Sequence, residues 1–181
     1  GATGSSPALL TNVAGTLFLR ATDSASGAEL WKSDGTTTTR VADIYAGTTS
    51  STPANFVNVA GTLYFTATAP GTGTELWKSD GTSGGTALVK DMASGSGSGS
   101  YANLTAINGW LFFRGSTAST NRELWTSDGT SAGTVLAKDI AAGTTLSSNP
   151  NSLVALNNKL YFIATTVAAG TELWTSDGTG A

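Results

Sequence analysis

Hydrophobic residues in this chain fall in short runs separated by turns rich in Gly, Ser, Thr and Asn. A first run, such as residues 8–13, is followed by a two-residue turn and a second run, such as residues 16–22. A third run contains Glu-Leu-Trp, and Ser-Asp-Gly separates it from a fourth run. The apolar residues do not recur at the three- and four-residue spacing of a helix. The pattern therefore predicts sets of four short β-strands.

The turns between the first and second runs are the clearest hairpin signals. They are Ala14-Gly15, Ala60-Gly61, Asn108-Gly109 and Asn157-Asn158. Gly and Asn tolerate the positive φ angles that two-residue hairpin turns require. Consecutive strands are therefore expected to pair antiparallel.

One eight-residue segment recurs through the chain. It reads ELWKSDGT at 29–36 and 75–82, and ELWTSDGT at 123–130 and 172–179. Its tryptophans (Trp31, Trp77, Trp125 and Trp174) are 46, 48 and 49 residues apart. That period, with four antiparallel strands in each unit, is typical of β-propeller blades. We therefore predict an all-β, propeller-like array; a β-solenoid is the alternative, but its rungs are usually shorter.

The repeat divides the chain into one repeat domain, 1–181, of four units. Their approximate bounds are 5–50, 51–100, 101–149 and 150–181. The fourth unit has no fourth apolar run after its Ser-Asp-Gly, so the sequence holds about three and three-quarter blades. The opening GATGSSP aligns with the linkers between units and supplies no such strand. An unpaired strand edge can pair with a strand of another chain. We therefore expect either that the sequence is a fragment of a longer array or that neighbouring molecules complete each other.

These segments resemble a known family. ELWKSDGT and ELWTSDGT, followed by GTALVKD and GTVLAKD, are similar to the ELWxxDGT repeats of large secreted bacterial proteins. The units also resemble kelch-type blades, and the Ser-Asp-Gly turn resembles the Asp-box of sialidase propellers. The resemblance spans nearly the whole chain and implies an extracellular or cell-surface β-propeller-like array. Unit 1 departs from it with TTTTRVAD, and unit 4 by its truncation.

Charge and composition exclude several classes of function. The net charge is −3, so no basic surface for nucleic acid is expected. No apolar run approaches the roughly 18 residues of a membrane helix, so membrane insertion is not expected. The chain has neither cysteine nor histidine, which excludes disulfides, Cys/His zinc sites and a Ser-His-Asp triad.

The acidic residues follow the repeat. Eleven of the twelve occupy repeated positions, whereas acid–base catalysis needs two groups in different environments. No enzyme activity and no cofactor are therefore expected. The Asp of each Ser-Asp-Gly is expected to accept hydrogen bonds from its own turn. Calcium is the alternative role for these residues, since it takes oxygen ligands; they are Asp34, Asp80, Asp128 and Asp177.

Shared positions are expected to be scaffold, and recognition is expected where the units differ. The four repeated tryptophans are accordingly predicted to pack between units. The loops between second and third strands differ most, together with the linkers between units; these loops are 23–28, 69–74, 117–122 and 166–171. Two residues depart from their counterparts. Trp110 stands where other units have Thr or Lys, and Arg122 where they have Ala or Thr.

The sequence thus favours a non-enzymatic adhesion or binding module, with a glycan or a protein as ligand. Trp110 and Arg122 are its candidate contact residues. The alternative is a structural subunit of a fibre or surface layer, completed by neighbouring copies or by adjacent repeats.

Overall fold

The computed structural model describes residues 4–142 and 146–177, which form fifteen β-strands and their connecting loops. Unit 1 contains β1 (Ala8–Val13), β2 (Thr16–Asp23), β3 (Gly27–Ser33) and β4 (Thr38–Ala42). Unit 2 contains β5 (Ala54–Val59), β6 (Thr62–Ala69), β7 (Gly73–Ser79) and β8 (Ala87–Lys90). Unit 3 contains β9 (Ala102–Ile107), β10 (Trp110–Gly115), β11 (Glu123–Ser127) and β12 (Val135–Lys138). Unit 4 contains β13 (Asn151–Leu156), β14 (Lys159–Thr166) and β15 (Gly170–Ser176).

Each unit is a separate antiparallel sheet whose strands follow one another in chain order. Units 1 to 3 have four strands each, and unit 4 has three in the part of the chain that the structure describes. The predicted all-β fold of antiparallel four-stranded units is thereby confirmed. Three segments lie outside the described residues. They are the first three residues of GATGSSP (1–3), part of the third linker (143–145) and the end of the fourth Ser-Asp-Gly-Thr segment (178–181).

The first turn of each unit has the predicted backbone conformation. In unit 1, φ is 49° at Ala14 and 87° at Gly15, and in unit 4 it is 50° at Asn157 and 60° at Asn158. Positive φ at both central residues matches the twist of the flanking strands. These turns therefore fix the register of the first and second strands.

The first strand of each unit carries a bulge that the apolar pattern does not indicate. Its register against the second strand shifts between Ala8 and Thr11 in unit 1, and at the same place in the other units. A residue with positive φ lies in each bulge; these residues are Leu9, Asn55, Asn103 and Ser152. Leu rarely adopts this conformation, so the bulge of unit 1 has no local sequence signal. Bulges increase the local twist of a strand, and here they do so once per unit.

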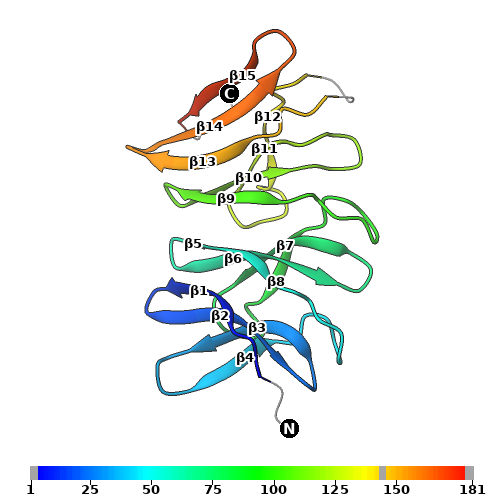
Figure 1. The fold of residues 1–181 in the computed structure, drawn as a ribbon, viewed down its shortest axis with the longest axis vertical. Coiled ribbons are helices and arrows are strands. Elements are labelled where there is room, and N and C mark those ends of the chain that lie inside the picture. The colour runs from blue at the N-terminus through cyan, green and yellow to red at the C-terminus, as the bar shows by residue number, and fades with distance from the viewer. Residues whose placement is uncertain (1–3, 143–145, 178–181) are drawn as a thin grey trace.

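The four sheets are stacked in sequence order, with the amino-terminal and carboxy-terminal ends of the stack far apart (Figure 1). The first strands of consecutive units lie side by side, β1 with β5, β5 with β9, and β9 with β13. No helix long and apolar enough to cross a membrane occurs in the described ranges.

Three hydrophobic clusters join the units, one at each interface between consecutive sheets. The first contains Phe18, Leu30 and Val41 of unit 1 with Leu63, Phe65 and Ala67 of unit 2. The second contains Tyr64, Leu76, Val89 and Met92 of unit 2 with Leu111, Phe113 and Trp125 of unit 3. The third contains Phe112 and Leu124 of unit 3 with Leu160, Phe162 and Ala164 of unit 4. Both faces of a middle sheet are thus buried, which explains its consecutive apolar residues.

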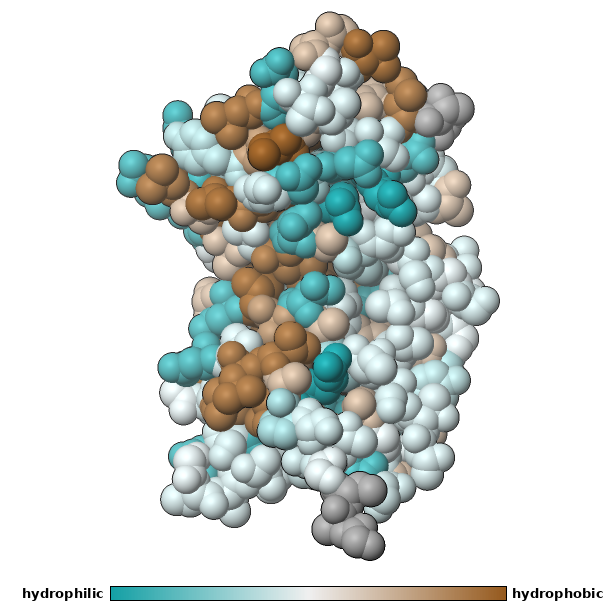
Figure 2. All heavy atoms as spheres, in the orientation of Figure 1, coloured by the Kyte–Doolittle hydropathy of each residue, from teal (hydrophilic) through white to brown (hydrophobic). Residues whose placement is uncertain are grey.

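The outer face of unit 4 lacks such a covering layer. Leu173 is 71% exposed, although its counterpart Leu76 in unit 2 is fully buried. Val154 and Leu156 are each 55% exposed on the same unit. Figure 2 shows hydrophobic side chains on the surface of the upper part of the molecule, where unit 4 lies.

Candidate functional site

The antiparallel strands sort the connections of each unit to two opposite ends. The turns between first and second strands and the Ser-Asp-Gly turns lie at one end, which we call the turn end. The loops between second and third strands lie at the other, the loop end, where the linkers join them. Backbone hydrogen bonds fasten linker to strand there, as from Thr68 N–H to Ser51 O and from Gly99 N–H to Thr74 O. The variable segments of the sequence therefore gather at the loop end.

Trp110 and Arg122 do not belong to one site. Trp110 begins β10 at the turn end and is 42% exposed. Arg122 is also exposed but immediately precedes β11, at the loop end. In the register of these two strands, Leu111 lies opposite Ser127, and Gly115 lies opposite Glu123. The length of β10 therefore separates the two candidate contact residues.

A polar depression of about 300 Å³ surrounds Arg122 at the loop end. Its walls come from the loop of unit 3 and from the linkers on either side of that unit. The lining residues are Ser100, Ser116, Thr117, Thr120, Asn121, Arg122 and Ser147. Hydrogen bonds hold the walls in place, including Thr117 N–H to Thr120 O (3.1 Å) and Arg122 N–H to Ser147 Oγ (3.3 Å).

The chemistry of this depression suits an oxygen-rich ligand. Side-chain hydroxyls both donate and accept hydrogen bonds, and a guanidinium offers several donors in a planar fork. That fork matches the geometry of a carboxylate or another oxyanion. The counterparts of Arg122 are Ala28, Thr74 and Thr171, so the cation is a property of unit 3 alone.

The Asp of the Ser-Asp-Gly turn has a local structural role in units 1 to 3, as the sequence predicts. Asp34 Oδ1 accepts hydrogen bonds from Thr36 N–H (2.9 Å) and Thr37 N–H (2.8 Å). Asp80 and Asp128 accept the corresponding bonds from the N–H and hydroxyl two residues later. These bonds favour the charged carboxylate and lower the pKa of Asp34, Asp80 and Asp128.

The same turns offer little to calcium. Asp34, Asp80, Asp128 and Asp177 are exposed, each on the turn of a different unit. No group of three or more Asp or Glu side chains that could hold a metal ion occurs in the described part of the chain. Calcium takes six to eight oxygen ligands, roughly, and each turn supplies a single carboxylate.

The Glu of Glu-Leu-Trp binds the linker that leaves its own unit, a role that the sequence did not reveal. Glu29 is fully buried. Its carboxylate accepts hydrogen bonds from Ile44 N–H (3.0 Å), Ser51 N–H (2.8 Å) and Ser51 Oγ–H (2.6 Å). We call this arrangement the linker clamp.

Unit 3 repeats the linker clamp with the same chemistry. Glu123 accepts hydrogen bonds from Ile140 N–H (2.9 Å), Ser148 N–H (2.8 Å) and Ser148 Oγ–H (2.6 Å). The Ser that closes each clamp lies in the linker two residues before a Pro. That recurring Ser-x-Pro was the only sequence signal for the clamp.

Unit 2 forms the clamp with a different donor. Gly99 stands in place of the Ser, and the hydroxyl of Tyr101 donates to Glu75 Oε2 instead (2.6 Å). Met92 N–H donates to the same oxygen (2.9 Å), while Glu75 Oε1 has no donor among the described residues. Burial raises the pKa of Glu75 and of Glu29, against the opposing effect of their hydrogen bonds.

The repeated tryptophans pack at the interfaces rather than in the depression. Trp125 is 6% exposed within the second cluster. Trp77 and Trp174 pack against the first and third clusters, each facing the preceding unit. Trp31 has no preceding unit in the described chain and is half-buried. The predicted packing between units therefore holds for three of the four.

Comparison with known proteins identifies no relative of this chain. No protein-family model matches the sequence, and no curated protein matches it.

Proposed function

We propose that the chain is a non-enzymatic, extracellular binding module of the ELWxxDGT repeat type, and that its loop end binds acidic glycans. The observation that carries the proposal is the depression around Arg122, which combines several hydroxyls with one exposed guanidinium. Glycans present hydroxyls and, where acidic, carboxylates or sulfates. Those are the partners that this set of donors and acceptors selects.

The size and openness of the site set the expected affinity. A volume of about 300 Å³ lies at the small end of ligand sites in proteins, which run from about 300 to 1,000 Å³. Such a site accommodates a short segment of a glycan and leaves the rest in water. We expect weak binding by one module, with a Kd on the order of 0.1–1 mM, and stronger binding by several linked modules.

The propeller arrangement belongs to the same proposal. Its support is that first strands of successive units adjoin and that each middle sheet is covered on both faces. A propeller has both features, because blades stack face to face around an axis lined by their first strands.

Binding of acidic and neutral oligosaccharides, followed by NMR titration, tests the proposal. We expect the acidic sugars to shift resonances of the loop end, and Arg122→Thr to weaken binding about tenfold. Thr is the residue that units 2 and 4 carry at this position, so the substitution suits the local backbone. Arg122→Lys keeps the charge and should retain part of the affinity.

Trp110→Thr is the matched control, because it also restores the residue of units 1 and 2 but at the turn end. It should leave binding unchanged. Loss of binding in Trp110→Thr, with full binding in Arg122→Thr, would place recognition at the turn end and refute the proposal.

A structural role in a fibre or surface layer is the second candidate. The exposed apolar outer face of unit 4 favours it, because neighbouring copies could cover Leu173 and Val154. Light scattering over a wide concentration range tests this role. A particle mass that stays at one chain up to high concentration would exclude it.

A further inference from the structure

We propose that the outer edge of unit 4 is an acceptor site for an added β-strand that has the sequence pattern of the units' own fourth strand and linker. Three features of the described chain meet there. They are the free edge of β15, an apolar cavity beside Trp174, and the exposed carboxylate of Glu172. The inference is independent of the glycan site, which lies on unit 3.

The edge of β15 differs from the equivalent edges of the other three units in its strand pairing. β3, β7 and β11 each pair with a fourth strand, β4, β8 and β12 respectively. β15 occupies their position in unit 4 and pairs with β14 on one side; within the described residues no strand lies on the other. A strand edge with unused backbone donors and acceptors is a template for another strand.

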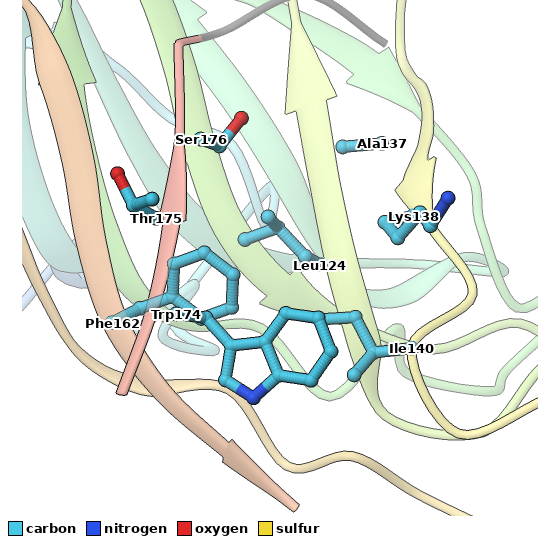
Figure 3. Close-up of a pocket in the computed structure, with 8 residues that line it drawn as sticks. All are labelled: Leu124, Ala137, Lys138, Ile140, Phe162, Trp174, Thr175 and Ser176. Atoms are coloured by element: carbon cyan, nitrogen blue, oxygen red, sulfur yellow. The ribbon is translucent and has the colours of Figure 1, made fainter. Parts of the chain in front are cut away.

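The cavity lies between the third and fourth strands of unit 3 and the edge of unit 4. Its volume is about 220 Å³. Trp174 and Phe162 line one side, and Leu124, Ala137 and Ile140 line the other (Figure 3). Lys138 lies at its margin, with its amino group pointing away from the indole of Trp174 (Figure 3).

The interface between units 2 and 3 shows what fills such a cavity. The counterparts of the lining residues there are Trp125, Phe113, Leu76, Val89 and Met92, which belong to one buried cluster. A sixth residue, Leu136 of the fourth strand, packs against that cluster.

Leu136 lies directly opposite Trp125 in the register of β11 and β12. Leu88 lies opposite Trp77 in the same way in unit 2. The cavity beside Trp174 therefore has the position and the lining of a site for one Leu on an added fourth strand.

Glu172 supplies the second half of the site. It is exposed, whereas Glu29, Glu75 and Glu123 are buried under the linker that follows their fourth strand. A segment that continues from the added strand into a linker would bring a backbone N–H and a Ser hydroxyl to this carboxylate. The occupant is thus an extended segment with a Leu at the cavity and a Ser in its linker.

The chain itself contains a suitable probe. A synthetic peptide with the sequence of residues 131–150 carries both Leu136 and Ser148. We expect a fluorescently labelled form to bind the protein, with slower amide hydrogen exchange in β15. Leu136→Asp in the peptide should weaken binding at least tenfold, because the cavity cannot hydrate a carboxylate.

A double-mutant cycle tests the role of Glu172. Ser148→Ala in the peptide should weaken binding about threefold to tenfold, and this loss should vanish against the Glu172→Ala protein, which has no side-chain acceptor at this position. Leu10→Ser on unit 1, which is 63% exposed in the wild type, is the control substitution in the protein and should have no effect.

Two results would overturn the proposal. One is equal affinity for the wild-type and Leu136→Asp peptides, which would show that the cavity takes no part. The other is peptide binding only after dilution dissociates a self-associated protein, which would assign the edge to a second copy of the chain.

Discussion

Glu29 and Ser51 are 22 residues apart in the chain, yet two hydrogen bonds join them. The backbone N–H of Ser51 donates to Oε1 (2.8 Å) and its hydroxyl donates to Oε2 (2.6 Å). The Glu of Glu-Leu-Trp in unit 1 thus faces inward and holds the linker that connects this unit to unit 2. This relationship gives the acid of unit 1 a structural role in holding its linker.

Removing the Glu of a unit should destabilise the protein only where a linker donates hydrogen bonds to that Glu. Glu123→Ala leaves two backbone N–H groups and a hydroxyl without their buried acceptor, and should lower the free energy of unfolding by about 3–5 kcal/mol. Glu172→Ala removes an exposed side chain and should change it by less than about 0.5 kcal/mol. Urea denaturation measures both, and equal losses would contradict the clamp.

Glycine at the start of the third strand should be required only where a linker passes. Gly73 has φ of 68°, and a Cβ there would overlap the carbonyl oxygen of Gly97. Gly170 has a similar φ of 73°, and apart from its chain neighbours no atom of the described residues lies within 4 Å of a Cβ placed there. Gly170→Ala should cost about 1–2 kcal/mol through backbone strain alone.

Gly73→Ala should cost about 1–3 kcal/mol more than Gly170→Ala, because the linker must also move. Thermal unfolding of the two variants provides the comparison. A smaller loss for Gly73→Ala would show that the linker yields freely.

The interfaces between units repeat the same geometry, so equivalent substitutions in two units can be compared a third time. Leu76 is fully buried between units 2 and 3, and Leu76→Ala should cost about 2–5 kcal/mol. Leu173 occupies the same position in unit 4 but is 71% exposed. Leu173→Ala should therefore cost less than about 0.5 kcal/mol. A large loss for Leu173→Ala in dilute protein would indicate that its face is covered in solution.

Acid should weaken the Ser-Asp-Gly turns. The pKa of Asp80 and of Asp128 is lower in the folded chain than the ordinary value of 3.8. Their stabilising effect is therefore complete above that value, and it is lost as the pH falls through the lower, folded-state pKa. The double variant Asp80→Asn, Asp128→Asn should be less stable than wild type at pH 6. The difference should shrink steadily below pH 3.8, as followed by denaturation at a series of pH values; a constant difference would refute this role.

The buried clamp of unit 2 should have the opposite pH dependence. The folded-state pKa of Glu75 is raised above its ordinary value of 4.5. A raised pKa means that the folded chain holds the proton more tightly, so stability falls as the pH rises from 4.5 through the folded value. Glu75→Gln removes this titration, and its stability relative to wild type should increase over that window. Asp91→Asn, a neighbour whose charge contributes to the shift, should diminish the effect without abolishing it.

Most of the strand framework could be predicted because its signals are local. The turn at Ala14-Gly15 needs positive φ, and the apolar runs on either side need burial, so a few adjacent residues determine each hairpin. The same reasoning placed the Asp of each Ser-Asp-Gly in its own turn. It also placed Trp77 and Trp125 between units, since repeated positions are those that the stacked sheets share.

The linker clamp and the depression could not be predicted, because they depend on segments distant in sequence. A backbone N–H has no sequence signature, and the hydroxyl of Tyr101 replaces a Ser in unit 2, so the donors share no single residue type. The depression likewise joins Ser100, Arg122 and Ser147 from three segments. Arg122 was identified by its departure from the other units, whereas the hydroxyls around it are common throughout the chain.

The linker clamp also determines how the molecule bears a mechanical load. Tension applied between the two ends of the stack must pass along the linkers from one sheet to the next (Figure 1). Because each linker is tied back to its own unit through one carboxylate, the pull shears several short, charge-assisted hydrogen bonds together. The slack in the linker cannot extend until those bonds rupture. A tethered molecule should therefore lengthen in discrete steps, and the force of each step should depend on the Glu of the unit that yields.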